Sequence, residues 1–383
     1  MPPPSSEILI IGGGVGGLAL ALALHRSGIP SLVCERAGEL LDVGAGILLT
    51  PNASWVLQRL GLLGELQDHG RIARSWKILD HAGRSLQTFS FERENPPPIS
   101  LARSILQTTL VNHLPPETLL LGREAVSIHA ATASSGPEVQ FADGEKLSAK
   151  LVVGADGGKS VARKNLFDDA PPRSRGYLGW RALAPIVPDA WRNGLISESW
   201  GDGSRFGISP VSPDRTYWYA TENASAGMES YRRNAKARLL EKFGCWHDPI
   251  RSLIEATPEE EILLSDIADH RVPARWHRGN VVLLGDSAHL MTPNLGQGAA
   301  MALEAAWVLA CCLSEHGIGA PALSRYERQR LWRTRGVVWA SRQIGRIIQL
   351  EHPLATRLRD FAFRCNPAWI GQKTLSPVFD FRV

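Results

Sequence analysis

The stretch from Glu7 to Arg36 constrains the fold more than any other, because it predicts a complete strand, helix, strand unit. The aliphatic run ILII leads into the turn GGGVGG, which is followed by LALALALHRSG and then by the apolar run SLVCE. The two apolar runs are typical of buried strands, and the segment between them is typical of a buried helix. Parallel strands need a right-handed crossover, so the unit predicts a Rossmann-like α/β domain with a parallel sheet.

Glycines at fixed positions in this turn predict a dinucleotide site. Gly12 permits the tight turn, Gly14 lets the backbone approach a pyrophosphate at the helix N-terminus, and Gly17 lets helix and strand pack closely. Glu35, at the end of the second strand, is suited to accept hydrogen bonds from a ribose hydroxyl. The pattern favours a bound dinucleotide over an empty turn, but it does not choose between NAD and FAD.

Two later motifs also place acidic residues at strand ends. Asp156 follows a buried strand in GADGGKSVAR, and Asp286 follows another in NVVLLGDSAH. In open α/β sheets, ligands bind beyond the carboxyl ends of the strands. Downstream of Asp286, the sequence PNLGQG opens an apolar helix, and its backbone amides can face negative charge on a ligand.

Short alternating runs predict a second, antiparallel sheet built from two separated insertions. One insertion spans about Trp76 to Phe91, and the other spans about Tyr177 to Glu222 with turns such as GDGS and SPDR. A hairpin followed by a buried strand is expected from Val139 to Val153. From Pro321 to Leu358 the chain is expected to be helical, with its many arginines in solvent.

Composition excludes several classes of protein. The net charge of +4 over 383 residues gives no support to nucleic-acid binding. Five cysteines without CxxC or His/Cys ligand spacing argue against a disulfide framework and against a metal site, so a cytoplasmic protein is expected. The first apolar run is broken by glycines and no other uncharged stretch reaches spanning length, so neither a signal peptide nor an integral membrane segment is predicted.

The order GxGxxG, GADG and GDSAH...P..GQG resembles that of the single-component (class A) FAD-dependent aromatic hydroxylases. The resemblance covers nearly the whole chain, with further similarity in VGAGILLTPNA, ARSILQTTL and GYLGWRALAP. The sequence is most similar to the branch that contains salicylate, 6-hydroxynicotinate and urate hydroxylases. Asn294 stands where urate hydroxylases carry an acidic residue, which makes urate a doubtful substrate.

The resemblance implies a set of FAD contacts. Glu35 and Arg36 would hold the adenosine part, Arg103 would reach the ribityl or phosphate region, and Ala125 would offer main-chain contacts to adenine. The complete predicted set is Gly12, Gly14, Val15, Gly16, Gly17, Glu35, Arg36, Gly46, Arg103, Ala125, Asp156, Asp286, Gly296, Gln297, Gly298 and Ala299.

The resemblance also implies the chemistry. NADH or NADPH, bound transiently, would reduce FAD, and a C4a-hydroperoxyflavin would transfer one oxygen atom from O2 to a small aromatic or heteroaromatic ring. Arg205 would grip an anionic substrate, Tyr217 would line its pocket, and Pro293 completes the predicted catalytic set. Two alternatives stay open: hydroxylation or epoxidation of a bulkier polyketide, antibiotic or isoprenoid, and a flavin-binding protein without turnover.

The predicted domain division is discontinuous. Residues 1–73, 100–168 and 270–325 would form the FAD-binding domain, residues 74–99 and 169–269 the substrate domain, and residues 326–383 a C-terminal helical segment. The oligomeric state is open between monomer and homodimer. His289 is expected to pack beside a strand and to cap local backbone rather than to act as a base.

Overall fold

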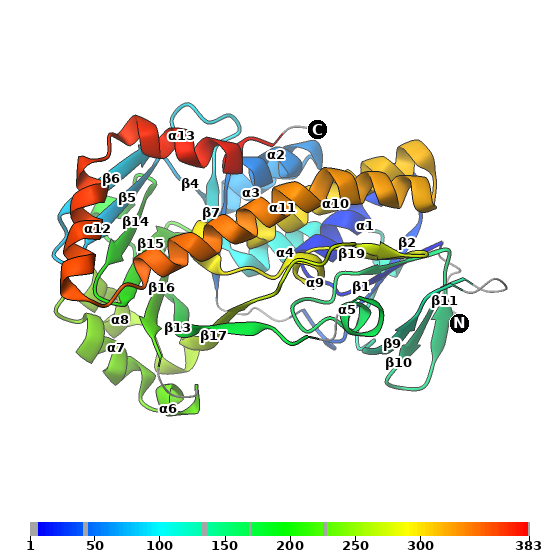
Figure 1. Ribbon diagram of the computed structural model, residues 1–383, viewed down its shortest axis with the longest axis horizontal. Helices are drawn as coiled ribbons and strands as arrows, with labels where there is room; N and C mark the ends of the chain where they lie inside the picture. The colour runs from blue at the N-terminus through cyan, green and yellow to red at the C-terminus, as the bar shows by residue number, and fades with distance from the viewer. Residues whose placement is uncertain (1–6, 41–44, 132–135, 168–169, 225–227, 382–383) are drawn as a thin grey trace.

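The computed structural model describes residues 7–40, 45–131, 136–167, 170–224 and 228–381 (Figure 1). Its first sheet has six strands in the order β18-β19-β12-β1-β2-β8. These strands are β1 (Ile8–Ile11), β2 (Ser31–Cys34), β8 (Leu119–Leu120), β12 (Leu151–Gly154), β18 (His277–Arg278) and β19 (Val281–Leu283). All neighbours pair in parallel except β18 with β19, so the predicted parallel sheet is confirmed.

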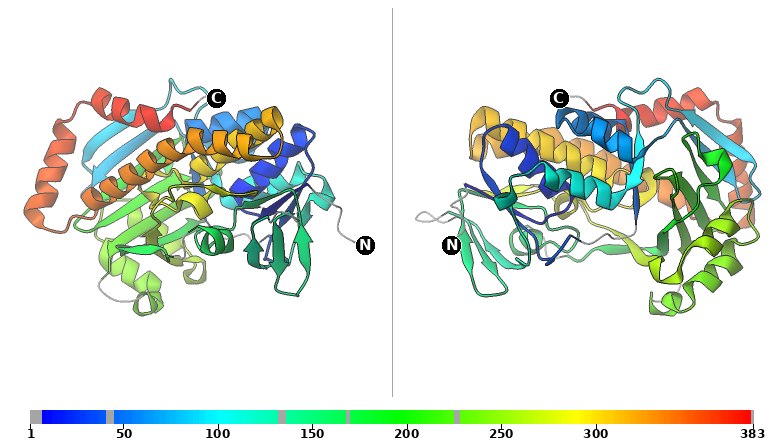
Figure 2. Two further views of the ribbon diagram at one scale, coloured as in Figure 1. Left: turned by 45° about the vertical axis from the view of Figure 1, so that its right-hand side comes forward. Right: turned by 180° about the vertical axis from the view of Figure 1, so that it is seen from behind.

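Helices cover one side of this sheet, and a small antiparallel sheet lies on the other (Figure 2). The covering helices are α1 (Val15–Arg26), α10 (Gly298–His316) and α11 (Ala320–Ile348). The small sheet contains β9 (Ala125–His129), β10 (Glu138–Phe141) and β11 (Lys146–Ser148). Strands β10 and β11 form the predicted hairpin, with FADGEK at its turn.

The second large sheet has seven strands in the order β17-β13-β16-β15-β14-β5-β6. They are β5 (Ser75–Asp80), β6 (Ser85–Ser90), β13 (Arg173–Ala184), β14 (Leu195–Trp200), β15 (Ser204–Pro210), β16 (Thr216–Asn223) and β17 (Leu263–Asp269). The two insertions do share one sheet, but the prediction that it is antiparallel throughout is wrong at one joint. Strand β14 pairs with β5 in parallel, because the insertions meet there without a hairpin between them.

The remaining elements connect and cover the two sheets. A three-stranded sheet of β3 (Gly46–Leu49), β7 (Ile99–Ala102) and β4 (Arg71–Ile72) lies where the chain passes between them. The helices are α2 (Pro51–Arg59), α3 (Leu63–His69), α4 (Arg103–Asn112), α5 (Val161–Leu166), α6 (Glu229–Arg232), α7 (Ala235–Phe243), α8 (Ile250–Ala256), α9 (Asp286–His289), α12 (Pro353–Cys365) and α13 (Ala368–Phe379).

Helix α11 runs from the first sheet to the second (Figure 1). The predicted division between residues 325 and 326 falls inside this helix. The hydroxyl of Tyr326, immediately after that division, donates to the carbonyl oxygen of Leu283 in β19 at 3.1 Å. The start of the predicted C-terminal segment is therefore continuous with the helical layer on the first sheet. The predicted division at 168/169 and residues 1–6 lie outside the described residues.

Helix α10 occupies the centre of the helical layer, between α1 and α11. Within the described chain it is the one helix long and apolar enough to cross a membrane, but 67% of its apolar window is buried in the protein. The sequence prediction concerned uncharged stretches only, and α10 contains Glu304 and Glu315. Its apolar residues Leu303, Val308 and Leu309 belong to the main core, which accounts for its composition.

Candidate active site

The glycine-rich turn between β1 and α1 has the geometry that the sequence predicts. Gly12 has φ +113°, and a Cβ there would overlap the carbonyl oxygen of Ala155. A Cβ on Gly17 would overlap the carbonyl oxygen of Gly12, so the third glycine is required for the close packing of helix and turn. A Cβ on Gly14 would meet no protein atom within 4 Å. The turn therefore leaves an open space at the N-terminus of α1, where a pyrophosphate fits.

Glu35 closes the other side of this turn. Its Oε2 accepts from the backbone N–H of Gly13 at 2.6 Å, and its Oε1 accepts from that of Ala37 at 2.9 Å. The carboxylate thus holds the turn in place, and each oxygen keeps a second lone pair for a ribose hydroxyl. Arg36 is exposed. Ala125 is the first residue of β9, and this strand lies near Glu35 because the N–H of Arg123 donates to the Glu35 carbonyl oxygen.

Asp156 caps a helix with one carboxylate oxygen and leaves the other without a partner. Its Oδ2 accepts from the N–H groups of Val161 and Ala162, at 2.6 and 3.2 Å, at the start of α5. Its Oδ1 is buried and has no hydrogen-bond partner among the described residues. Burial raises the pKa of this carboxyl group, although the hydrogen bonds around it act in the opposite direction. A buried carboxylate oxygen without a partner is a position that a ligand, a water molecule or an ion can satisfy.

A cavity of about 410 Å³ lies between the first sheet and the seven-stranded sheet. That volume is in the range of small-molecule sites. Twelve of the predicted residues line it: Gly14, Val15, Gly16, Gly46, Arg103, Arg205, Tyr217, Asp286, Pro293, Gly296, Gly298 and Ala299. The other predicted residues, Gly12, Gly17, Glu35, Arg36, Ala125, Asp156 and Gln297, do not line it.

Gln297 does not line the cavity, but its side chain supports residues that do. Its side chain is fully buried, donates to Thr50 Oγ1 at 2.8 Å and accepts from Asn52 Nδ2 at 3.0 Å. It therefore joins the start of α10 to the loop that carries Thr50, which lines the cavity. The neighbouring glycines at positions 296 and 298 would place a Cβ in open space, so the backbone here is free to approach a flat ligand.

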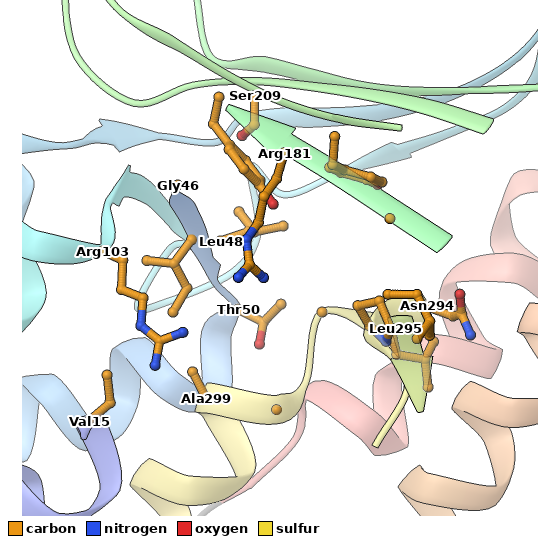
Figure 3. A pocket seen from close by; sticks show the side chains of 18 of the residues that line it. Val15, Gly46, Leu48, Thr50, Arg103, Arg181, Ser209, Asn294, Leu295 and Ala299 are labelled. Carbon is orange, nitrogen blue, oxygen red and sulfur yellow. The ribbon is translucent and has the colours of Figure 1, made fainter. Parts of the chain in front are cut away.

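Charged groups from separate elements face this space. Arg103, from the start of α4, and Arg181, from β13, point into it from different walls (Figure 3). Burial raises the pKa of Asp286, while the positive charges of Arg103 and His270 oppose that shift. Burial likewise lowers the pKa of Arg103, and Asp286 opposes it. Together with the open helix N-terminus and the unpartnered Asp156 oxygen, these residues fit a flavin dinucleotide.

Arg205 is less suited to grip an anion than the sequence predicts. Its Nη1 lies 3.3 Å from Oε2 of Glu198, and both side chains are buried. The Tyr219 hydroxyl donates to the same carboxylate, and Trp200 Nε1 donates to Glu198 Oε1 at 2.5 Å. The positive charge of Arg205 is therefore balanced inside the protein. Sequence reasoning missed Glu198, and its signal was weak: a single acidic residue facing the same side of the strand as two apolar neighbours in ISESW.

Tyr217 and Arg181 form the wall opposite the flavin motifs. A Cβ on Gly46 would overlap Tyr217, so the glycine lets β3 and β16 come together at the cavity. Burial raises the pKa of Tyr217 against the charges of Arg181, Arg205 and Arg103, which keeps the phenol neutral. Among the described side chains, no carboxylate forms an ion pair with Arg181, so its guanidinium is available to a ligand.

His289 is buried beside Trp276, with ring centroids 5.7 Å apart. The expected packing is observed, but the expected capping by the ring is wrong, because neither ring nitrogen has a hydrogen-bond partner among the described residues. Burial, together with the charge of Arg330, lowers the pKa of His289 from 6.5 to about 3. The ring is therefore neutral in the folded protein near pH 7, and it does not line the cavity. No cluster of three or more His, Cys, Asp or Glu residues in the described chain could hold a metal ion.

This burial predicts an acid sensitivity. Below pH 6.5 the unfolded chain binds a proton at His289 that the folded protein does not bind until about pH 3. The free energy of unfolding is therefore expected to fall as the pH falls through that window. In His289→Leu the fall should be shallower, as measured by urea unfolding at a series of pH values. Equal slopes in the two proteins would contradict this assignment.

Known proteins resemble this chain both in sequence and in structure. The FAD binding domain model matches residues 5–341. The aurachin C monooxygenase/isomerase of Stigmatella aurantiaca is 39% identical over 365 residues, 93% of each chain. The 2-heptyl-3-hydroxy-4(1H)-quinolone synthase of Pseudomonas aeruginosa is 33% identical over 94% of each chain. The crystal structure of Klebsiella pneumoniae HpxO with FAD and uric acid has a TM-score of 0.90 at 28% identity, covering 98% of this chain and 97% of that one. The similarity therefore includes both sheets and the cavity between them.

Proposed function

Because the chain belongs to the single-component FAD-dependent aromatic hydroxylases, we propose that it uses NAD(P)H and O2 to hydroxylate an aromatic or heteroaromatic ring. The balanced reaction converts the ring C–H, O2, NAD(P)H and a proton into the ring C–OH, water and NAD(P)+. FAD, when bound, supplies the electron transfer from NAD(P)H and the activation of O2.

The observation that supports this proposal most directly is the shared cavity. Gly14 and Asp286 from the flavin motifs and Arg181 and Tyr217 from the second sheet line the same space. A substrate ring on the Arg181 side would therefore lie next to a flavin held by the motifs. Oxygen transfer needs this closeness, and it needs few water molecules at the reacting atoms.

The residues of this chain have separate parts in the proposed reaction. Arg103 and Asp286 would hold the flavin, and the helix N-terminus at Gly298 would face the negative charge that develops on the reduced ring. Arg181 would bind an oxyanion or carbonyl oxygen of the substrate, and the neutral Tyr217 hydroxyl can donate a hydrogen bond to it. Arg205 would act through Glu198, by fixing the polar wall of the cavity.

The ring that the cavity favours is larger than a simple benzoate. Two relatives are named aurachin C monooxygenase/isomerase and 2-heptyl-3-hydroxy-4(1H)-quinolone synthase, and the second name contains a two-ring heterocycle. The cavity of this protein is lined on one side by Leu48, Trp76, Phe91 and Ile196, which a small polar acid would leave uncovered. We therefore propose a 4-quinolone-like heterocycle as the first substrate to test. A cytoplasmic location is proposed with it, supported by five unpaired cysteines.

A stopped-flow experiment tests the proposal. The purified holoenzyme is mixed with NADH or NADPH without oxygen, and flavin absorbance is followed with and without 4-quinolones, aromatic acids and polycyclic phenols. We expect at least one compound to speed flavin reduction by tenfold or more, about 1.4 kcal/mol in the barrier. A flavoprotein that neither nucleotide reduces in the presence of any of them would be a binding protein without turnover.

A further inference from the structure

One wall of the cavity is made of apolar side chains from five separate elements and segments of the chain. Phe91 and Ile196 belong to one small hydrophobic cluster, against which Leu48, Trp76 and Phe379 pack. All five also line the cavity. Since they come from the strands β3, β5 and β14, the segment after β6, and the last residue of α13, this wall is a feature of the tertiary structure and not of one sequence motif.

Polar groups beside this wall are already satisfied by the protein. Ser197, next to Ile196 in β14, accepts a hydrogen bond from Trp191 Nε1 at 3.1 Å. Ser209 in β15 is hydrogen-bonded to Ser100 at 2.7 Å. A ligand group placed here would gain from burial of apolar surface rather than from hydrogen bonds.

Phe379 closes the wall and separates two cavities. It also lines a second cavity of about 420 Å³, whose other lining residues include the polar side chains Glu94, Asn95, Ser376 and Asp380. Its ring lies 6.4 Å from that of Phe91, at an interplanar angle of 66°. An apolar group that extends along the wall would therefore meet Phe379, and beyond Phe379 it would meet a polar space.

We propose that the substrate ring carries an unbranched apolar chain that lies along this wall, and that Phe379 sets the longest chain accepted. The inference rests on the proposed function, because it places the chain of the same ring that would be hydroxylated. It assigns Phe379 as a residue that determines specificity without taking part in the reaction.

The test measures binding to the oxidised holoenzyme, without NAD(P)H, by the change in flavin absorbance. The probes are 2-alkyl-4(1H)-quinolones from methyl to nonyl. Affinity is expected to rise about fourfold with each methylene group until the chain reaches Phe379, and then to stop rising. In Phe379→Ala the rise should continue to longer chains, whereas in Phe379→Trp it should stop earlier.

Controls separate this inference from the function on which it rests. Phe361→Ala, in the exposed face of α12 and outside both cavities, should leave the chain-length profile unchanged. If Phe379→Ala does not fold, Phe379→Leu should still lengthen the accepted chain. Affinity that is independent of chain length, or a limit that the Phe379 variants do not move, would overturn the inference. Failure of NAD(P)H to reduce the flavin in the separate stopped-flow test would overturn the function instead.

Discussion

Gly17→Ala is expected to abolish FAD binding and to lower the free energy of unfolding by about 3 kcal/mol or more. The added methyl group would overlap the carbonyl oxygen of Gly12, which is backbone and cannot rotate away. Either α1 or the turn must move, and both form the proposed site for the pyrophosphate. The measurements are the FAD content of the purified protein and its urea unfolding midpoint.

Gly14→Ala is the matched control for this result. Its methyl group would meet no protein atom within 4 Å, so the stability of the protein without FAD should change little. The same methyl group would project into the space proposed for the pyrophosphate, so FAD affinity should fall by at least tenfold, about 1.4 kcal/mol. Normal FAD binding by Gly14→Ala would place the cofactor elsewhere.

Glu304→Ala is expected to destabilise the protein by about 3–5 kcal/mol, because it leaves a buried positive charge without its partner. Glu304 is fully buried in α10, and its Oε2 lies 2.6 Å from Arg330 Nη1 in α11. Arg333 also donates to this carboxylate, at 2.7 and 2.8 Å, and Asn52 donates at 2.6 Å. A loss of this size is a large part of the roughly 5–15 kcal/mol that stabilises a typical domain.

A surface pair gives the comparison for Glu304. Arg251 Nε lies 2.8 Å from Glu255 Oε1 in α8, and both side chains are about half exposed. Glu255→Ala should cost no more than about 1 kcal/mol, because solvent screens the pair. Denaturant unfolding of the two variants measures the difference. Equal losses would contradict a stabilising role for the buried ion pairs of Glu304.

The local features of the flavin side could be predicted from the sequence because each depends on neighbouring residues. The glycine turn follows from the spacing of Gly12, Gly14 and Gly17, and the parallel sheet follows from the strand and helix patterns around it. The positions of Asp156 and Asp286 at strand ends follow in the same way. The structure places Asp286 in the cavity and leaves an oxygen of Asp156 without a partner.

Features that depend on distant parts of the chain could not be predicted. Arginines of α11 were expected in solvent, yet Arg330 and Arg333 reach a carboxylate that lies some thirty residues earlier in α10. The ion pair between Glu198 and Arg205 forms only because β14 and β15 are neighbours in the sheet. Strands β14 and β5 pair in parallel although they lie more than a hundred residues apart in the chain. No local sequence pattern predicts such a pairing.

Isotope incorporation is the most direct test of the claim that flavin and aromatic ring share one cavity for oxygen transfer. The holoenzyme would be supplied with NAD(P)H, 18O2 and the compound that best stimulates flavin reduction, and the product would be analysed by mass spectrometry. We expect one 18O atom in the product hydroxyl group and none from water. Consumption of NAD(P)H that yields only hydrogen peroxide with every such compound, or a hydroxyl group that carries oxygen from water, would contradict the account.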